Sequence, residues 1–100
     1  MQLSKLKLVT IIADDSLRHL LEEHITELGA KGYTVSHVEG KGKTGSRDSA
    51  WSGENVKIET IVPDVVCDRI ISKIANQFFP SYAVIVYISD VEVLRSTHFR

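Results

Sequence analysis

The segment at residues 40–45 has the residue types and spacing for binding an anion. It reads GKGKTG and matches the dinucleotide fingerprint G-x-G-x-x-G. That fingerprint requires a helix after the glycines and an acidic residue about 20 positions further on, whereas residues 46–55 continue as a polar loop. The GKT at 42–44 also matches the end of a P-loop, but His37 occupies the position of the first P-loop glycine. Both fingerprints therefore fail.

The same loop keeps the chemistry of simple anion binding. Its glycines allow backbone N–H groups to approach an anion, and Lys41, Lys43 and Arg47 add positive charge. The alternative is a flexible hairpin loop without a ligand. Trp51 lies in this polar stretch with no apolar periodicity around it. It is either an exposed anchor for a partner, a role that aromatic residues favour, or an indole that folds back onto its own or a neighbouring subunit.

The remaining reactive side chains form no recognisable site. The four histidines are scattered, at positions 19, 24, 37 and 98. His19 and Glu23 share a helix face without a third ligand at a suitable spacing, so we interpret them as a solvated surface and predict no metal site. Cys67 is the only cysteine, which excludes an internal disulfide, and it falls on a helical stripe typical of a core. Glu59 is either a buried carboxylate or a partner for Lys57 of a neighbouring subunit. No catalytic residue is assigned, because a catalytic triad is defined by geometry.

Hydrophobic periodicity predicts the elements that position these residues. Strands are expected at residues 5–13, 33–39, 56–62 and 82–88, and helices at residues 17–28 and 64–78. Asp14, Asp15 and Ser16 are cap candidates for the first helix, Gly29 ends it, and Pro80 ends the second. The order β-α-β-β-α-β predicts an α+β, ferredoxin-like sandwich, in which two helices cover one face of an antiparallel sheet. The loop at 40–55 is longer than the usual hairpin loop of roughly two to five residues.

The uncovered face of this sheet predicts an oligomer. The first and fourth strands carry apolar residues on both faces, among them Val9, Ile11, Ala83, Ile85 and Tyr87. Water cannot be the neighbour of all of them, because a large apolar patch normally marks an interface. We therefore expect subunits to associate through the open sheet face.

Length and composition indicate one ordinary globular domain, residues 1–100. Of the 100 residues 43% are apolar and 25% are charged, and the formal net charge is -1. Such a charge balance gives no general attraction to nucleic acid or to anionic membranes. No signal-peptide pattern and no apolar run of about 20 residues occurs. We expect a soluble, cytoplasmic protein.

Several stretches resemble the PII family of signalling proteins. LGAKGYTV at 28–35 followed by GKG at 40–42 resembles their second strand and the start of their loop, and VKIETIVPD at 56–64 resembles their third strand. FPSYAVIVYIS at 79–89, followed by VEVL at 91–94, is similar to the PII-like branch associated with bicarbonate transport and carboxysomes. The similarity covers nearly the whole chain.

The resemblance implies a trimer with an adenine nucleotide in each cleft between subunits, and a loop, the T-loop, that contacts a partner, commonly a membrane transporter. By position, the cleft would be lined from one side by Thr34, Gly40 and Gly42. Glu59, Thr60 and Ile61 would lie beside the base, with Tyr87 and Ile88 nearby. The candidates for binding phosphate are Lys43, Arg47 and Arg95.

The sequence also departs from the family pattern. Residues 77–82, which correspond to a Gly-rich phosphate loop in classical PII proteins, contain no glycine. This favours weaker discrimination for ATP, with AMP, ADP or cyclic AMP as alternatives. The loop has no tyrosine to be modified and no second arginine shortly after Arg47, and the C-terminal cysteine pair of the bicarbonate-transporter regulators is absent. No redox switch of that kind is expected.

Together these observations predict a non-catalytic regulatory trimer. It would bind adenine nucleotides, with bicarbonate as a further candidate ligand. Through the loop near Trp51 it would regulate a partner in inorganic-carbon uptake, such as a bicarbonate transporter at the inner membrane or a carboxysome-related protein. Two alternatives on the same fold are a small phosphate-ester hydrolase and a metal-binding trimer.

Overall fold

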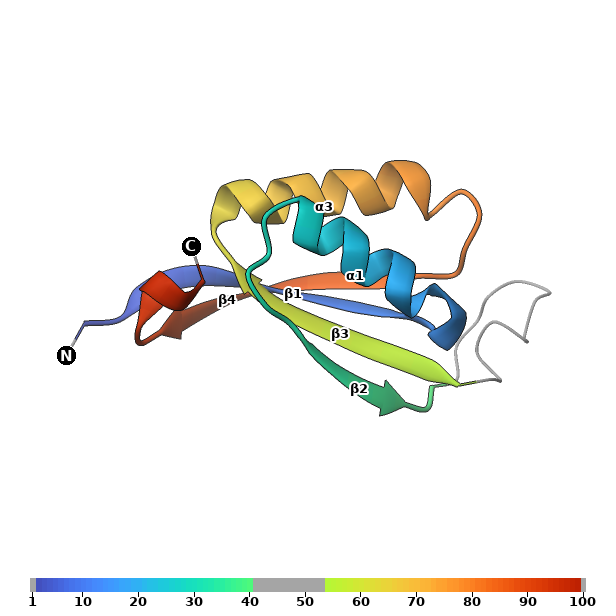
Figure 1. The fold of residues 1–100 in the computed structure, drawn as a ribbon, viewed down its shortest axis with the longest axis horizontal. Coiled ribbons are helices and arrows are strands. Elements are labelled where there is room, and N and C mark those ends of the chain that lie inside the picture. Colours follow the sequence, from blue (N-terminus) through green and yellow to red (C-terminus); the bar gives the residue numbers. More distant parts are fainter. Residues whose placement is uncertain (1, 41–53, 100) are drawn as a thin grey trace.

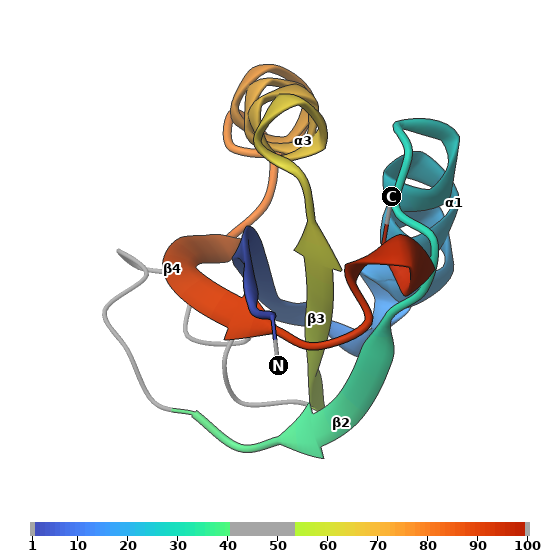
Figure 2. The same cartoon turned by 90° about the vertical axis from the view of Figure 1, so that its left-hand side faces the viewer.

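The computed structural model describes residues 2–40 and 54–99, and in these residues it has the predicted β-α-β-β-α-β order. The elements are β1 (Ser4–Asp14), a 3-10 turn η1 (Asp15–Leu17), α1 (Arg18–Glu27), β2 (Thr34–Val38), β3 (Asn55–Val62), α3 (Asp64–Gln77), β4 (Ile85–Val93) and a 3-10 turn η2 (Ser96–His98). The strands form one antiparallel sheet in the order β2-β3-β1-β4. Both helices cover the same face of this sheet (Figures 1 and 2). The ferredoxin-like prediction is confirmed.

The first helix is one residue shorter at each end than the predicted 17–28, and the cap that the sequence indicated belongs to the turn η1 before it. A carboxylate oxygen of Asp14 accepts a hydrogen bond from the backbone N–H of Ser16 at 2.8 Å, which satisfies one of the free donors of the first turn. After α1, Gly29 adopts a φ of 123°. A Cβ at this position would lie 2.9 Å from a methyl carbon of Val66 in α3. A glycine is therefore needed both for the backbone conformation and for the close approach of the two helices.

The fourth strand lies later in the chain than predicted. Residues 82–84 precede it, because the backbone N–H groups of Ser81 and Tyr82 bond to the carbonyl of Phe78 at 3.0 and 2.8 Å and close a turn after α3. The strand then runs unbroken to Val93, which pairs with Ser4 at the start of β1. β4 is thus a continuous partner of the 11-residue β1, and it extends beyond residue 88, where the sequence predicted its end.

The core lies between the sheet and the two helices. Val9, Ile11, Val56 and Ile58 are fully buried there. The other buried residues of this core come chiefly from the helices: Leu17, Leu21, Ile25, Val66, Cys67, Ile70, Ile74 and Phe78. The single cysteine is therefore a core residue, as its position on the helical stripe indicated.

Neither α1 nor α3 covers the other face of the sheet. Side chains alternate along a strand, so Thr10 shares this face with its register partners Glu59 on β3 and Tyr87 on β4. Ile85 and Tyr87 expose 44% and 46% of their surface. Val9 and Ile11 are buried beneath the chain's own helices. On the open face of the sheet, the large apolar side chains that stay exposed are Ile85 and Tyr87 of β4.

Candidate functional site

A cavity of about 420 Å³ lies where β2 begins. It is lined by residues of three strands, of the connection from α1 to β2, and of the segment after η2: Leu8, Gly32, Tyr33, Thr34, Glu59, Thr60, Ile61 and Phe99. Four of the residues that the resemblance implicated, Thr34, Glu59, Thr60 and Ile61, thus lie around one cavity.

Strand pairing and one side-chain hydrogen bond fix the shape of this cavity. Thr34 and Glu59 are register partners on β2 and β3, so their side chains project on the same face. The Thr60 hydroxyl donates to the carbonyl oxygen of Gly32 at 2.7 Å, and Thr60 is only 2% exposed. Thr60 therefore holds the α1–β2 connection against β3, and its hydroxyl proton is already committed.

The cavity combines one carboxylate with apolar and aromatic surface. Glu59 is half-buried and supplies acceptor oxygens, while Leu8 and Ile61 supply aliphatic contacts and Tyr33 and Phe99 supply ring faces. This arrangement suits a flat heterocycle that donates hydrogen bonds from an edge. None of the eight lining residues carries a positive charge, so the phosphates of a nucleotide would be bound by groups outside this set.

The remaining predicted residues lie at different distances from the cavity. Tyr87 is on the same face as Glu59 but two strands away, because β1 lies between β3 and β4. Ile88 is the register partner of Val9, so it points to the side of the sheet that the helices cover. Gly40 follows β2 and is exposed. Arg95 follows β4, with a φ of 57° and a contact of 2.7 Å from its Nη2 to Nε2 of His98.

The residues of the loop itself lie outside the described part of the chain. This applies to Lys41, Gly42, Lys43, Arg47 and Trp51, which fall in residues 41–53. Their predicted roles in binding anions or a partner stay predictions.

The sequence reasoning missed Leu8, Gly32, Tyr33 and Phe99. Leu8 falls within the strand predicted at residues 5–13, and strand pairing places it beside Ile61, its register partner on β3. Tyr33 immediately precedes Thr34, and an exposed aromatic beside an implicated residue was an available signal. Phe99 gave no signal, because no periodic pattern extends into the last residues of the chain.

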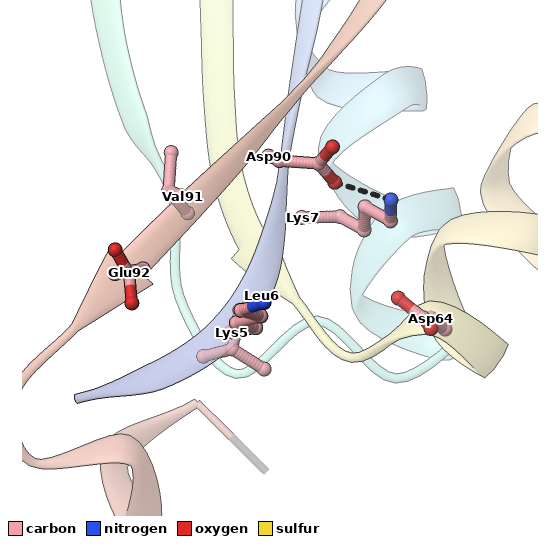
Figure 3. Close-up of a pocket in the computed structure, with 7 residues that line it drawn as sticks. All are labelled: Lys5, Leu6, Lys7, Asp64, Asp90, Val91 and Glu92. Carbon is pink, nitrogen blue, oxygen red and sulfur yellow. Dashed lines mark hydrogen bonds and ion pairs between the residues drawn. The ribbon is translucent and has the colours of Figure 1, made fainter. Parts of the chain in front are cut away.

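A second cavity, of about 450 Å³, contains a mixture of charges. Lys7 and Asp90 are register partners and form an ion pair there, and Asp64 lies near them at the start of α3 (Figure 3). The hydrogen bond and the charge of Asp90 raise the pKa of Lys7, and the same contacts lower the pKa of Asp90. Because the charge of Lys7 is already compensated by Asp90 on the neighbouring strand, we interpret these residues as a structural ion pair between β1 and β4 and not as a ligand site.

The described residues offer neither a metal site nor a membrane span. Residues 2–40 and 54–99 contain no group of three or more His, Cys, Asp or Glu side chains that could hold a metal ion. Among the same residues no helix is both long and apolar enough to cross a membrane.

Comparison with known proteins places the chain next to signalling proteins. Residues 6–98 match the family model described as nitrogen regulatory protein P-II. A PII-like signalling protein from Thermus thermophilus is 43% identical over 100% of both chains, with a TM-score of 0.86. CPII from Thiomonas intermedia K12, solved with ADP and bicarbonate, is 25% identical over 99% of this chain and 98% of its own, with a TM-score of 0.87. GlnK from B. subtilis, solved with ATP, is 19% identical over 87% of this chain and 82% of its own, with a TM-score of 0.65, and shows the shared fold alone.

Proposed function

The chain belongs to the nitrogen regulatory protein P-II family, and on this premise we propose that it is a signalling protein that binds an adenine nucleotide and regulates a partner, without catalysis of its own. The observation that carries the proposal is the cavity at the start of β2, where Glu59 faces apolar and aromatic walls. The CPII structure with ADP and bicarbonate supports the same class of ligand.

The carboxylate of Glu59 suits a base edge that donates hydrogen bonds. Adenine donates from its amino group at position 6, and an ionised carboxylate only accepts, so Glu59 would bind this amino edge. Guanine also donates, from N1–H and its 2-amino group, so the preference for adenine is proposed from the ADP bound by CPII. Leu8 and Ile61 would then contact the face of the ring, and Thr34 would be free to bond the sugar or a ring nitrogen.

The phosphates require groups beyond the eight lining residues. Arg95 lies on the same C-terminal segment as Phe99, and Lys43 and Arg47 belong to the loop that follows Gly40. We assign the phosphates to these three cations. Because residues 77–82 contain no glycine to cradle a triphosphate, we expect AMP, ADP or cyclic AMP to bind about as well as ATP.

A trimer would complete each site. Ile85 and Tyr87 leave apolar surface exposed on the open sheet face, and surface of this kind normally marks an interface. We propose that three copies associate through this face, and that the neighbouring copy closes the cavity over its ligand. Tyr87 would then lie in the subunit contact.

The partner is proposed from the loop. Residues 40–55, with Trp51 as an aromatic anchor, would contact a membrane bicarbonate transporter or a carboxysome-related protein, and nucleotide binding would control that contact. The protein would act in the cytoplasm, recruited to the inner membrane by such a transporter. A Trp51→Ala change should then abolish co-sedimentation with transporter-containing vesicles and leave the affinity for nucleotide unchanged.

A thermal-shift screen tests the nucleotide site. The ligands are AMP, ADP, ATP, cyclic AMP, GTP and bicarbonate, with the nucleotide products analysed after incubation to detect hydrolysis. A ligand at about 100 times its dissociation constant adds roughly 2.7 kcal/mol to the free energy of unfolding. We expect larger shifts with adenine nucleotides than with GTP. Equal shifts with ATP and GTP would refute the preference for adenine, and catalytic turnover would refute the non-catalytic assignment.

A charge-neutralising pair of variants locates the site. Glu59→Gln keeps the size of the side chain but removes its charge, and hydrogen bonds to charged groups are stronger than neutral ones by about 1–1.5 kcal/mol. We expect the affinity for ADP to fall roughly tenfold. Glu23→Gln, at an exposed position of α1, is the matched control and should bind as the unchanged protein does. Equal affinities of the two variants would place the ligand elsewhere.

A further inference from the structure

The segment after β4 makes a turn that ordinary residues disfavour. Arg95 has a φ of 57°, in the left-handed region that a residue with a Cβ seldom adopts. The turn is closed by a hydrogen bond from the backbone N–H of His98 to the carbonyl of Arg95 at 3.1 Å, and by the contact of 2.7 Å between their side chains. The chain is thus held in a reversal over residues 95–98.

This reversal brings the end of the chain to the cavity. In two views at right angles, the turn η2 lies near the connection from α1 to β2 (Figures 1 and 2). Phe99 lines the cavity together with Tyr33 and Leu8 and is partly buried. Without the left-handed turn at Arg95, the extended direction of β4 would carry Phe99 away from β2.

We propose that Phe99 is a ligand-contacting residue whose ring packs against the base of the bound nucleotide. The inference rests on the proposed function and adds to it an aromatic residue that the resemblance did not implicate. Aromatic rings stack on any base through their faces, whereas Glu59 reads an edge. The two residues therefore make different contacts, since Phe99 packs against the face of the ring and Glu59 accepts hydrogen bonds from its edge.

The geometry also links the base to the phosphates. Phe99 and Arg95 are separated by one turn of the chain, and the contact between Arg95 and His98 fixes that turn. A base against Phe99 would therefore hold Arg95 in place beside the same ligand. Base and phosphate would then be bound by a single short segment that is ordered by a strained turn.

Binding of ADP to Phe99 variants tests the inference. Phe99→Ala removes the ring, Phe99→Leu keeps apolar bulk without a π-face, and Leu94→Ala is the control, because Leu94 is 46% exposed on the same segment and does not line the cavity. We expect Phe99→Ala to weaken ADP roughly 5- to 150-fold, the range for loss of one stacking contact. Phe99→Leu should fall in between, and Leu94→Ala should be unchanged.

A second measurement reports the stacking directly. The H2 and H8 protons of ADP should move upfield in its NMR spectrum when the unchanged protein binds it, and less so with Phe99→Leu. Circular dichroism and light scattering establish that each variant keeps its fold and assembly.

The results separate the two proposals. If the unchanged protein binds ADP and Phe99→Ala binds it equally well, the inference is overturned and the nucleotide site stands. Tighter binding by Phe99→Ala would also overturn it, because the ring would then be an occupant that the base displaces. If the unchanged protein binds no nucleotide, the proposed function and the inference fail together.

Discussion

Replacing Thr60 with Val removes one hydroxyl group and almost no volume, at a position that is 2% exposed. The lost group is the donor of the 2.7 Å hydrogen bond to the carbonyl of Gly32. A bond of this kind contributes about 0.5–1.5 kcal/mol net. Gly32 is exposed, so water can solvate the released carbonyl, and we expect the loss to lie near the lower end of that range.

The loss should be visible as a lower melting temperature. For a domain of roughly 60–100 residues, 1 kcal/mol corresponds to about 4–8 °C, so Thr60→Val should melt about 3–6 °C lower. Because Thr60 holds the connection that carries Tyr33 and Thr34, the affinity for ADP should also fall several-fold. Melting followed by circular dichroism at a fixed protein concentration, with calorimetric titration of ADP, measures both quantities.

Thr26→Val is the matched control, since Thr26 is exposed on α1 and an exposed substitution usually changes stability by less than about 0.5 kcal/mol. If Thr60→Val melted within 1 °C of this control (about 0.2 kcal/mol), the hydrogen bond to Gly32 would not hold the connection in place. A normal affinity for ADP despite a lower melting temperature would separate stability from the shape of the site, and it would refute the positioning role of Thr60.

Three further outcomes follow from the structure. Gly29→Ala should lower the free energy of unfolding, measured in urea, by about 1–3 kcal/mol, because Gly29 has a φ of 123° and a Cβ there would lie 2.9 Å from an α3 side chain. Gly32→Ala is the control, since no atom lies within 4 Å of a Cβ at that position. An equal loss of stability in the two variants would contradict this reasoning. Ile85→Glu places a charge on the open face, so light scattering should report smaller particles and ADP binding should be lost; a monomer that binds ADP normally would show that one chain suffices. The hydrogen bond from Ser16 lowers the pKa of Asp14 below its ordinary 3.8. The ionised carboxylate therefore stabilises the folded state above that pH, and this contribution is lost as the pH falls through the lowered pKa. Asp14→Asn should then flatten the fall in stability below about pH 4, and an unchanged acid profile would argue against a stabilising role of the Asp14 carboxylate.

The sequence predicted the fold because the fold depends on local periodicity and chain punctuation. Apolar stripes at helical spacing defined both helices, and Gly29 marked the end of the first one through the same left-handed conformation that the structure contains. The start of β4 could not be predicted in this way. Residues 82–88 are apolar enough for a strand, but the backbone bonds that Phe78 accepts after α3 keep the first of them in a turn.

For the candidate site, too, some features follow from the sequence and others only from the tertiary structure. Alternation alone places Tyr87 and Ile88 on opposite faces of a strand, so their separation was already determined by sequence. That Thr34 faces Glu59 depends on strand register, which is fixed only when two strands pair and bury one common face. The position of Phe99 at the cavity could not be predicted from a sequence pattern either. It depends on the left-handed backbone of Arg95, which directs the following residues back to β2. Residue types and periodicity thus determined the elements and the class of chemistry. Tertiary packing, which no local pattern encodes, decided that residues as distant as 8, 33, 59 and 99 line one cavity.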